Sequence, residues 1–283
     1  MSKKKNMNKK IIAGVVVVLG LMFGGSQALP ELAESWLNGD DATTILGNLT
    51  AGNSQITDNG GNTGTLPYNQ ATYDELAALD FASGDEAVVT VNDNQASLNI
   101  ADWQTNHAVY GNLDELNRTT FVTAYIDETN LGSSENRGSQ VWQPTGWHQK
   151  EVDGQPIYNR GHLLAYTSSF NLDEDGNYLE GAEGSEDNPK NLATQSAYSN
   201  QQVQTKFEAK IREAQKISGN RVLYQIVTVF RGDELMPRGY WLQAVDSAGT
   251  LDFNVYEFNV QPNVVFNYSD GSSKIDRSMT VAE

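Results

Sequence analysis

The sequence contains three histidines, His107, His148 and His162, so few side chains can act as a base near neutral pH. His162 ends the segment Asn159-Arg160-Gly161-His162, in which the glycine is expected to let the backbone turn tightly. Arginine binds phosphate through a planar fork, and neutral imidazole can take a proton from water. This combination points to chemistry on a phosphate group, although a plain surface turn would have the same local sequence.

A second set of polar residues leads into an amphipathic stretch. Asn191 precedes, and Asn200 begins, the stretch 200–217, where apolar side chains recur every three or four positions and predict a helix. Asn200 and Glu208 would be about 12 Å apart along that helix, and both could serve one ion, Asn200 directly and Glu208 through an ordered water. A helix cap is the alternative role for Asn200.

The rest of the pattern predicts an α+β fold. Strands are expected at residues 87–91 and 119–126 before the helix, and at 221–230, 253–260 and 264–268 after it. Strands followed by one strong helix and further strands favour a central antiparallel sheet. No Gly-x-Ser-x-Gly elbow, zinc-peptidase histidine pair or cysteine is present, which disfavours serine hydrolase, zinc peptidase and thiolate chemistry.

The N-terminal part of the chain is predicted to direct export. Five lysines precede an uncharged apolar run at 11–23, and small residues follow, so residues 1–28 are typical of a signal peptide. An uncleaved membrane tether through 11–23 is the alternative, and either version places the protein outside the cell or at its surface. Residues 29–67 are expected to be a low-complexity linker, because Gly, Asn and Thr dominate them, and 68–283 to be the working domain.

The net charge of the chain argues against a nucleic-acid substrate, but the distribution of that charge weakens the argument. The 283 residues carry 19 Lys and Arg against 36 Asp and Glu, a net charge of −17, which argues against a polyanionic partner. However, residues 188–238 contain eight basic and four acidic residues. Arg118 and Arg137 are the candidates for contacting phosphate. The acidic segment 173–187 is expected to be a disordered surface loop.

The ordered set Asn159-Arg160-Gly161-His162, Asn191, Asn200-Gln201 and Glu208, preceded by Pro144-Thr145-Gly146-Trp147, resembles the DNA/RNA non-specific endonuclease family. It is most similar to secreted or surface-anchored nucleases of Gram-positive bacteria. The resemblance implies a ββα-metal core with one helix that carries the metal ligand. By the same resemblance, His162 matches the general base, Asn200 the metal ligand and Glu208 a carboxylate that holds metal-bound water. Asn191 matches a residue that supports the site, and Arg160 the motif arginine.

The implied activity is a metal-dependent endonuclease that cuts DNA and RNA to 5′-phosphorylated fragments through contacts with the backbone. A neutral Asn ligand suits Mg²⁺, with Mn²⁺ as a substitute. Asn159 stands where the family usually has Asp, which keeps open a degenerate nuclease or a surface-tethered module that binds nucleic acid without cutting it. A base with the ordinary histidine pKa would lose activity below about pH 6.5.

Overall fold

The computed structural model describes residues 66–135 and 137–282, which belong to one compact unit, Leu66–Glu283. The predicted signal peptide or tether and most of the predicted linker lie outside the described residues. The boundary at residue 68 therefore stays a prediction. Within the described part of the chain, no helix is both long and apolar enough to cross a membrane.

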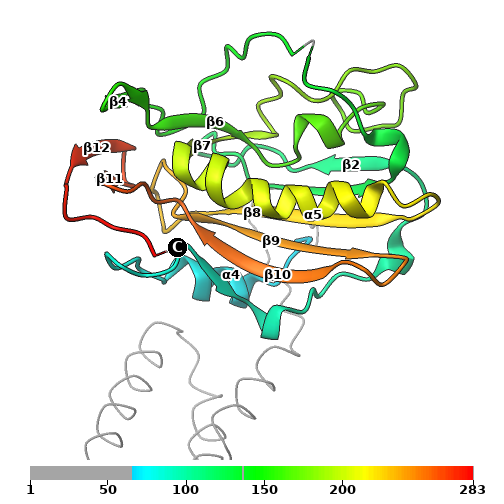
Figure 1. Cartoon of the computed structure of the whole chain (residues 1–283), viewed down its shortest axis with the longest axis horizontal. Helices are drawn as coiled ribbons and strands as arrows, with labels where there is room; N and C mark the ends of the chain where they lie inside the picture. Colours follow the sequence, from blue (N-terminus) through cyan, green and yellow to red (C-terminus); the bar gives the residue numbers. More distant parts are fainter. Residues whose placement is uncertain (1–65, 136, 283) are drawn as a thin grey trace, which may run out of the picture. The chain divides into compact units, whose positions relative to one another are not determined.

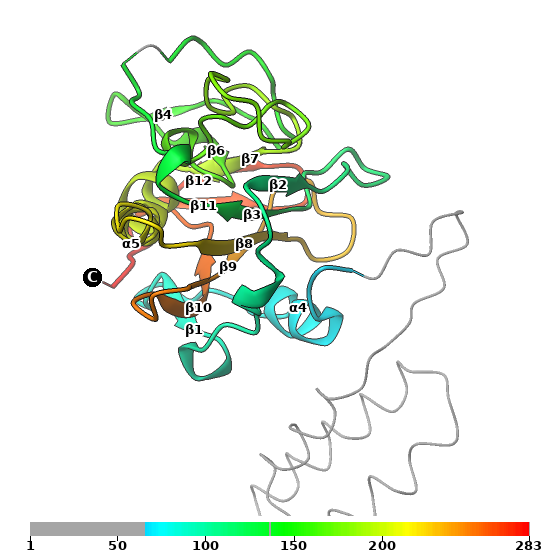
Figure 2. The ribbon, with the colours of Figure 1, turned by 90° about the vertical axis from the view of Figure 1, so that its right-hand side faces the viewer.

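A six-stranded antiparallel sheet forms the centre of the unit, with strand order β1-β10-β9-β8-β3-β2 (Figures 1 and 2). This confirms the predicted α+β class with a central antiparallel sheet. The strands of this sheet are β1 (Val88–Thr90), β2 (His107–Tyr110), β3 (Phe121–Ile126), β8 (Val222–Val229), β9 (Gly239–Asp246) and β10 (Asp252–Phe258). Three separate two-stranded antiparallel pairs are β4 (Glu151–Val152) with β5 (Gln155–Pro156), β6 (Tyr158–His162) with β7 (Leu192–Ser196), and β11 (Val264–Asn267) with β12 (Ser272–Ile275).

Helices cover both faces of the sheet. The short helix α4 (Gln70–Ala77) packs on one face, and α5 (Thr205–Gln215) lies across the other, between the sheet and the β6–β7 pair (Figure 1). A π-helical turn, η5 (Ser199–Gln204), leads directly into α5. Short 3₁₀ turns occur at Asn92–Asn94, Ile100–Asp102, Glu128–Asn130 and Tyr166–Ser168.

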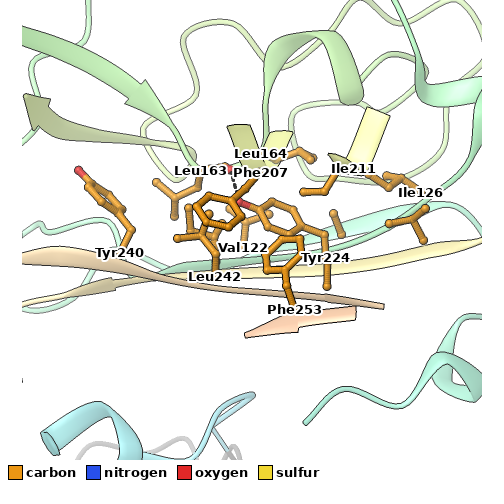
Figure 3. Close-up of a cluster of buried hydrophobic side chains, with 14 of the residues drawn as sticks. Val122, Ile126, Leu163, Leu164, Phe207, Ile211, Tyr224, Tyr240, Leu242 and Phe253 are labelled. Carbon is orange, nitrogen blue, oxygen red and sulfur yellow. Dashed lines mark hydrogen bonds between the residues drawn. The ribbon is translucent and has the colours of Figure 1, made fainter. Parts of the chain in front are cut away.

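The core under α5 holds the end of β6 in place. Phe207 and Ile211 of α5 point into the same cluster as Leu163 and Leu164, which directly follow β6 (Figure 3). The Tyr224 hydroxyl of β8 also donates to the Leu163 carbonyl over 3.3 Å. Burying each of these leucines stabilises the fold by about 1.5–3 kcal/mol. The residue just before them, His162, is thereby tied to the rigid sheet.

The β6–β7 pair needs Gly161 because of close packing and not because of a turn. Gly161 lies within an extended strand opposite Ala193, and its φ is not positive, so the expected tight turn is wrong. A Cβ at position 161 would instead lie 2.0 Å from Oε1 of Gln195 and 2.8 Å from its Cβ. The glycine therefore makes room for the fully buried side chain of Gln195.

We expect Gly161→Ala to lower the free energy of unfolding by about 1–3 kcal/mol, because a rigid strand and a buried side chain must move apart. Gly138→Ala is the control, since its Cβ would meet only the carboxylate end of Glu186, at 3.1 Å. That change should stay within about 0.5 kcal/mol of the parent. Urea unfolding of the two variants measures the difference, and equal effects would contradict the packing role of Gly161.

Candidate active site

His162 lies at the end of β6 with its two ring nitrogens in different surroundings. Its side chain is only 7% exposed. Nε2 is 2.9 Å from the main-chain oxygen of Glu186, an atom that can only accept, so Nε2 carries the proton. Nδ1 therefore carries the lone pair, which faces Nη2 of Arg137 at 3.4 Å. The arrangement fixes both the orientation of the ring and the nitrogen that can act as a base.

Burial keeps this imidazole neutral. Desolvation lowers the pKa of His162 to about 4, and the positive charge of Arg137 acts in the same direction, against smaller opposing effects of the Glu186 and Ser185 backbone and of Asp187. The ring is therefore uncharged well below the ordinary histidine pKa. This places the expected acid limit of a His162 base below the pH 6.5 that the ordinary histidine pKa predicts.

Asn200 lies in the π-turn η5 beside the same cleft. Its Nδ2 donates to Oε1 of Gln195 over 2.9 Å. Because this bond holds the nitrogen end of the amide, Oδ1 is the end available to a ligand. The alternative of a helix cap does not apply, since Asn200 lies inside a continuous run of π- and α-helix rather than before it.

Glu208 lies in the first turn of α5 and lines the cleft with Asn200. In a regular α-helix, residues eight apart would be offset by about 80°. In the wider π-turn each residue rotates less about the helix axis, which brings the side chains of Asn200 and Glu208 closer to one face. Oε1 of Glu208 accepts from Gln204 over 3.1 Å, and Oε2 is 3.5 Å from Nη1 of Arg212. Burial raises the pKa of Glu208, while Arg212 and Gln204 oppose the rise.

Two arginines extend the site toward solvent. Arg137 reaches His162 from the loop after the 3₁₀ turn Glu128–Asn130, and its guanidinium lies over the ring of Tyr166. Arg160 of β6 stacks on Trp147 at 4.5 Å and donates through Nε to the Trp142 carbonyl. Both arginines line the cleft, so the structure brings them together with His162.

The acidic segment 173–187 is folded, so the expectation of a disordered loop is wrong. Besides the Glu186 carbonyl that holds His162, the Asp187 carboxylate accepts from the main-chain nitrogens of Val141 and Trp142 at 3.0 Å each. The segment therefore anchors the loop that carries Arg137. The sequence of this segment indicates only its negative charge. In the fold, one of its main roles is that the backbone oxygen of Glu186 accepts a hydrogen bond from His162.

Arg118 and Asn191 lie apart from the residues that line the cleft. The Arg118 guanidinium pairs with Asp114 at 2.6 Å and donates to the Gly232 and Glu234 carbonyls, and it is not among the cleft residues. Asn191 is fully buried, and its amide bonds both the nitrogen and the oxygen of Leu164. Asn191 therefore holds the backbone just after His162, while Arg118 braces a loop.

Two buried glutamines were missed in the sequence. Gln204 donates to the His162 carbonyl over 2.7 Å and to Glu208, and its Oε1 accepts from Nε2 of Gln195 over 2.9 Å. Gln195 in turn bonds Asn200. The sequence signal that could have identified them is a polar residue within an otherwise apolar strand or helix. Their hydrogen-bond partners, however, are set only by the tertiary fold.

The cleft that these residues line has a volume of about 610 Å³. Within residues 66–135 and 137–282, no group of three or more His, Cys, Asp or Glu could hold a metal ion. A cation in the cleft would therefore rely on a few neutral or singly charged oxygens. Asn200 Oδ1 and the Glu208 carboxylate are hard oxygen donors of the kind that Mg²⁺ prefers, so the residues present fit such an ion.

Comparison with known proteins identifies the family and supports the fold. The crystal structure of NucA from Streptococcus agalactiae with a magnesium ion bound is 25% identical and has a TM-score of 0.60, over 73% of this chain and 96% of that one. The metal-free form of the same nuclease gives 25% identity and a TM-score of 0.58, over 75% and 98% of the two chains. The Sda1 nuclease with a bound zinc ion shares the fold at 16% identity and a TM-score of 0.51, over 66% and 95%. A sequence model of DNA/RNA non-specific endonucleases matches residues 97–247, more than half of the chain, and the chain therefore belongs to that family of nucleases.

Proposed function

We propose that this nuclease is exported and hydrolyses the phosphodiester bonds of DNA and RNA with Mg²⁺, releasing 5′-phosphorylated fragments. One observation carries the proposal: the lone pair on Nδ1 of His162 lies beside Arg137 in the cleft that Asn200 and Glu208 also line. A base, a phosphate-binding cation and oxygen ligands for a metal are the groups that this hydrolysis needs.

His162 would act as the general base. The hydrogen bond from Nε2 to the Glu186 carbonyl stabilises the positive charge that develops when Nδ1 takes a proton from water. Arg137, next to Nδ1, would bind a nonbridging phosphate oxygen and thereby bring the phosphorus close to that water. Arg160, held against Trp147, would bind a neighbouring phosphate.

Asn200 Oδ1 would hold the Mg²⁺ ion, and the Glu208 carboxylate would hold water on it. When bound, the ion supplies positive charge to the scissile phosphate and the leaving oxygen. The magnesium-bound NucA structure supports Mg²⁺, and we propose that Mn²⁺ can replace it. All of these contacts are to phosphate groups, so little sequence preference is expected.

Export is proposed from the sequence, through a signal peptide at 1–28 or a tether through 11–23, with a linker at 29–67 before the domain at 68–283. The rival function, binding without cutting, rests on Asn159. However, Oδ1 of Asn159 accepts from Nε2 of Gln201 over 2.8 Å, the same role that an Asp oxygen would have. The exchange of Asp for Asn leaves this contact intact, which favours cutting.

Plasmid nicking in Mg²⁺ tests the proposal, with EDTA as the metal-free control. We expect His162→Ala to slow nicking by about 10²–10⁴-fold, because the base is lost. Arg137→Ala should slow it by about 10–100-fold, through loss of a charge-assisted hydrogen bond. Arg118→Ala is the matched control and should stay within about twofold, since Arg118 already pairs with Asp114. A parent protein that binds DNA but never cuts it with any divalent ion would establish the binding module instead.

The pH dependence follows from the depressed pKa of His162. A base whose pKa is lowered stays neutral until the pH falls toward about 4, so cleavage should persist well below pH 6.5. Arg137→Gln removes a positive charge that lowers this pKa, so its acid limit should move to higher pH. Arg160→Gln is the control, because Arg160 is not among the charges that act on His162.

Proton NMR of the imidazole Cε1–H can measure this pKa directly in metal-free protein. A His162 signal that titrates near 6.5 in the parent would contradict the assignment. So would an unchanged pKa in Arg137→Gln.

A further inference from the structure

Glu257 is an unusual residue for its position in the sheet. It lies on β10 in the row of Phe253 and Val255, on the face that packs under α5, and it is 0% exposed. No cation pairs with it in the described part of the chain, and its Oε2 is buried without a hydrogen-bond partner. Burying such a group is costly, and an apolar residue would fit this row better.

The other oxygen of Glu257 bonds the side chain that controls Asn200. Oε1 accepts from Nε2 of Gln195 over 3.0 Å and from the Ser199 hydroxyl over 3.4 Å. Because the Ser199 hydroxyl points its hydrogen at Glu257, its lone pair faces Gln195 and accepts from Nε2 over 2.9 Å. Glu257 therefore determines two of the three acceptors around the nitrogen of Gln195, and Oε1 of Gln204 is the third.

This arrangement selects one of the two possible orientations of the Gln195 amide. With the two N–H bonds of Nε2 shared among three acceptors, Oε1 must face Asn200 and accept from its Nδ2 over 2.9 Å. The Asn200 amide is thereby turned with its oxygen toward the cleft. If Gln195 reversed, its nitrogen would meet the nitrogen of Asn200, which would then have to turn its oxygen away from the cleft.

We propose that Glu257 is a positioning residue that sets, through Gln195, the orientation of Asn200 in which its oxygen can bind the catalytic cation. Burial and the charge of Glu208 raise the pKa of Glu257 well above that of an ordinary carboxyl. Its Oε1 directs the Gln195 amide by accepting a hydrogen bond from Nε2. The inference rests on the proposed role of Asn200.

The test measures Mn²⁺ affinity by electron paramagnetic resonance, with protein but no nucleic acid, so that it does not depend on turnover. Asn200→Ala defines the binding that belongs to the site, because an acidic surface also binds Mn²⁺ weakly. We expect Glu257→Met, which has a similar size and no strong acceptor, to weaken site binding by at least tenfold. Glu257→Gln keeps an acceptor oxygen and should stay within about threefold of the parent.

Val255→Ala is the matched structural control. Val255 lies two residues away in the same buried row, and its truncation should lower thermal stability without changing Mn²⁺ affinity. In nicking assays, Glu257→Met should raise the half-saturating Mg²⁺ concentration by at least tenfold and recover to within about threefold of the parent rate at saturating Mg²⁺. A variant that was only less folded would lose rate without a change in the Mg²⁺ requirement.

Three results would overturn the inference. If Asn200→Ala loses site binding but Glu257→Met does not, the positioning role is wrong while the proposed function stands. If Glu257→Gln weakens binding as much as Glu257→Met, acceptance of a hydrogen bond is not what Glu257 contributes. If Asn200→Ala binds Mn²⁺ like the parent, the assignment of Asn200 as the metal ligand is wrong, and the inference fails with it.

Discussion

The hydrogen bonding of one buried amide, Gln195, is the constraint on which the site depends. Its nitrogen and oxygen ends have opposite requirements, and burial makes an unpaired end costly, so only one orientation satisfies its neighbours. Gly161 provides the space for this side chain. Through Gln204 the same network reaches the His162 carbonyl and Glu208. His162, Glu208 and Asn200, the proposed base, carboxylate and metal ligand, are therefore held by one set of buried hydrogen bonds rather than by separate loops.

A strongly acidic chain can still carry a site for a polyanion, because its acids near the cleft are used locally. The Asp187 carboxylate accepts from two main-chain nitrogens, and the Glu208 carboxylate lies 3.5 Å from Nη1 of Arg212. The positive groups Arg137 and Arg160 line the cleft itself. Over distances beyond about 10 Å the remaining acids are screened at ordinary salt, so the local arrangement matters more than the net charge of −17.

The apolar pattern predicted some elements, whereas β6, β7 and the largely apolar β9 were not predicted as strands. The helix after Asn200 and strands β3, β8 and β10 have clear apolar patterns, because at least one face of each must be buried. No strand was predicted at β6 or β7, since Arg160, Gly161 and Gln195 interrupt any alternation. His162, Asn200, Glu208, Arg160 and Arg137 do line one cleft, as the motifs indicated. Arg118 and Arg137 could not be distinguished, because the distinction depends on partners such as Asp114 that a linear pattern does not reveal.

A metal site with a neutral amide in place of several carboxylates attracts the cation less strongly, and it requires the amide to be held in one orientation. Several carboxylates would bind a cation strongly whichever oxygen they presented, whereas an amide binds it only through its oxygen end. Such a site leaves the cation nearly its full charge for the phosphate, but it works only if the amide cannot turn over. Burying Gln195, Gln204 and Glu257 among apolar side chains costs stability. The need to orient one amide oxygen toward a weakly held cation explains why these polar residues are nevertheless present. Hydrogen bonds that would be replaceable in an ordinary core fix the direction of a single oxygen here.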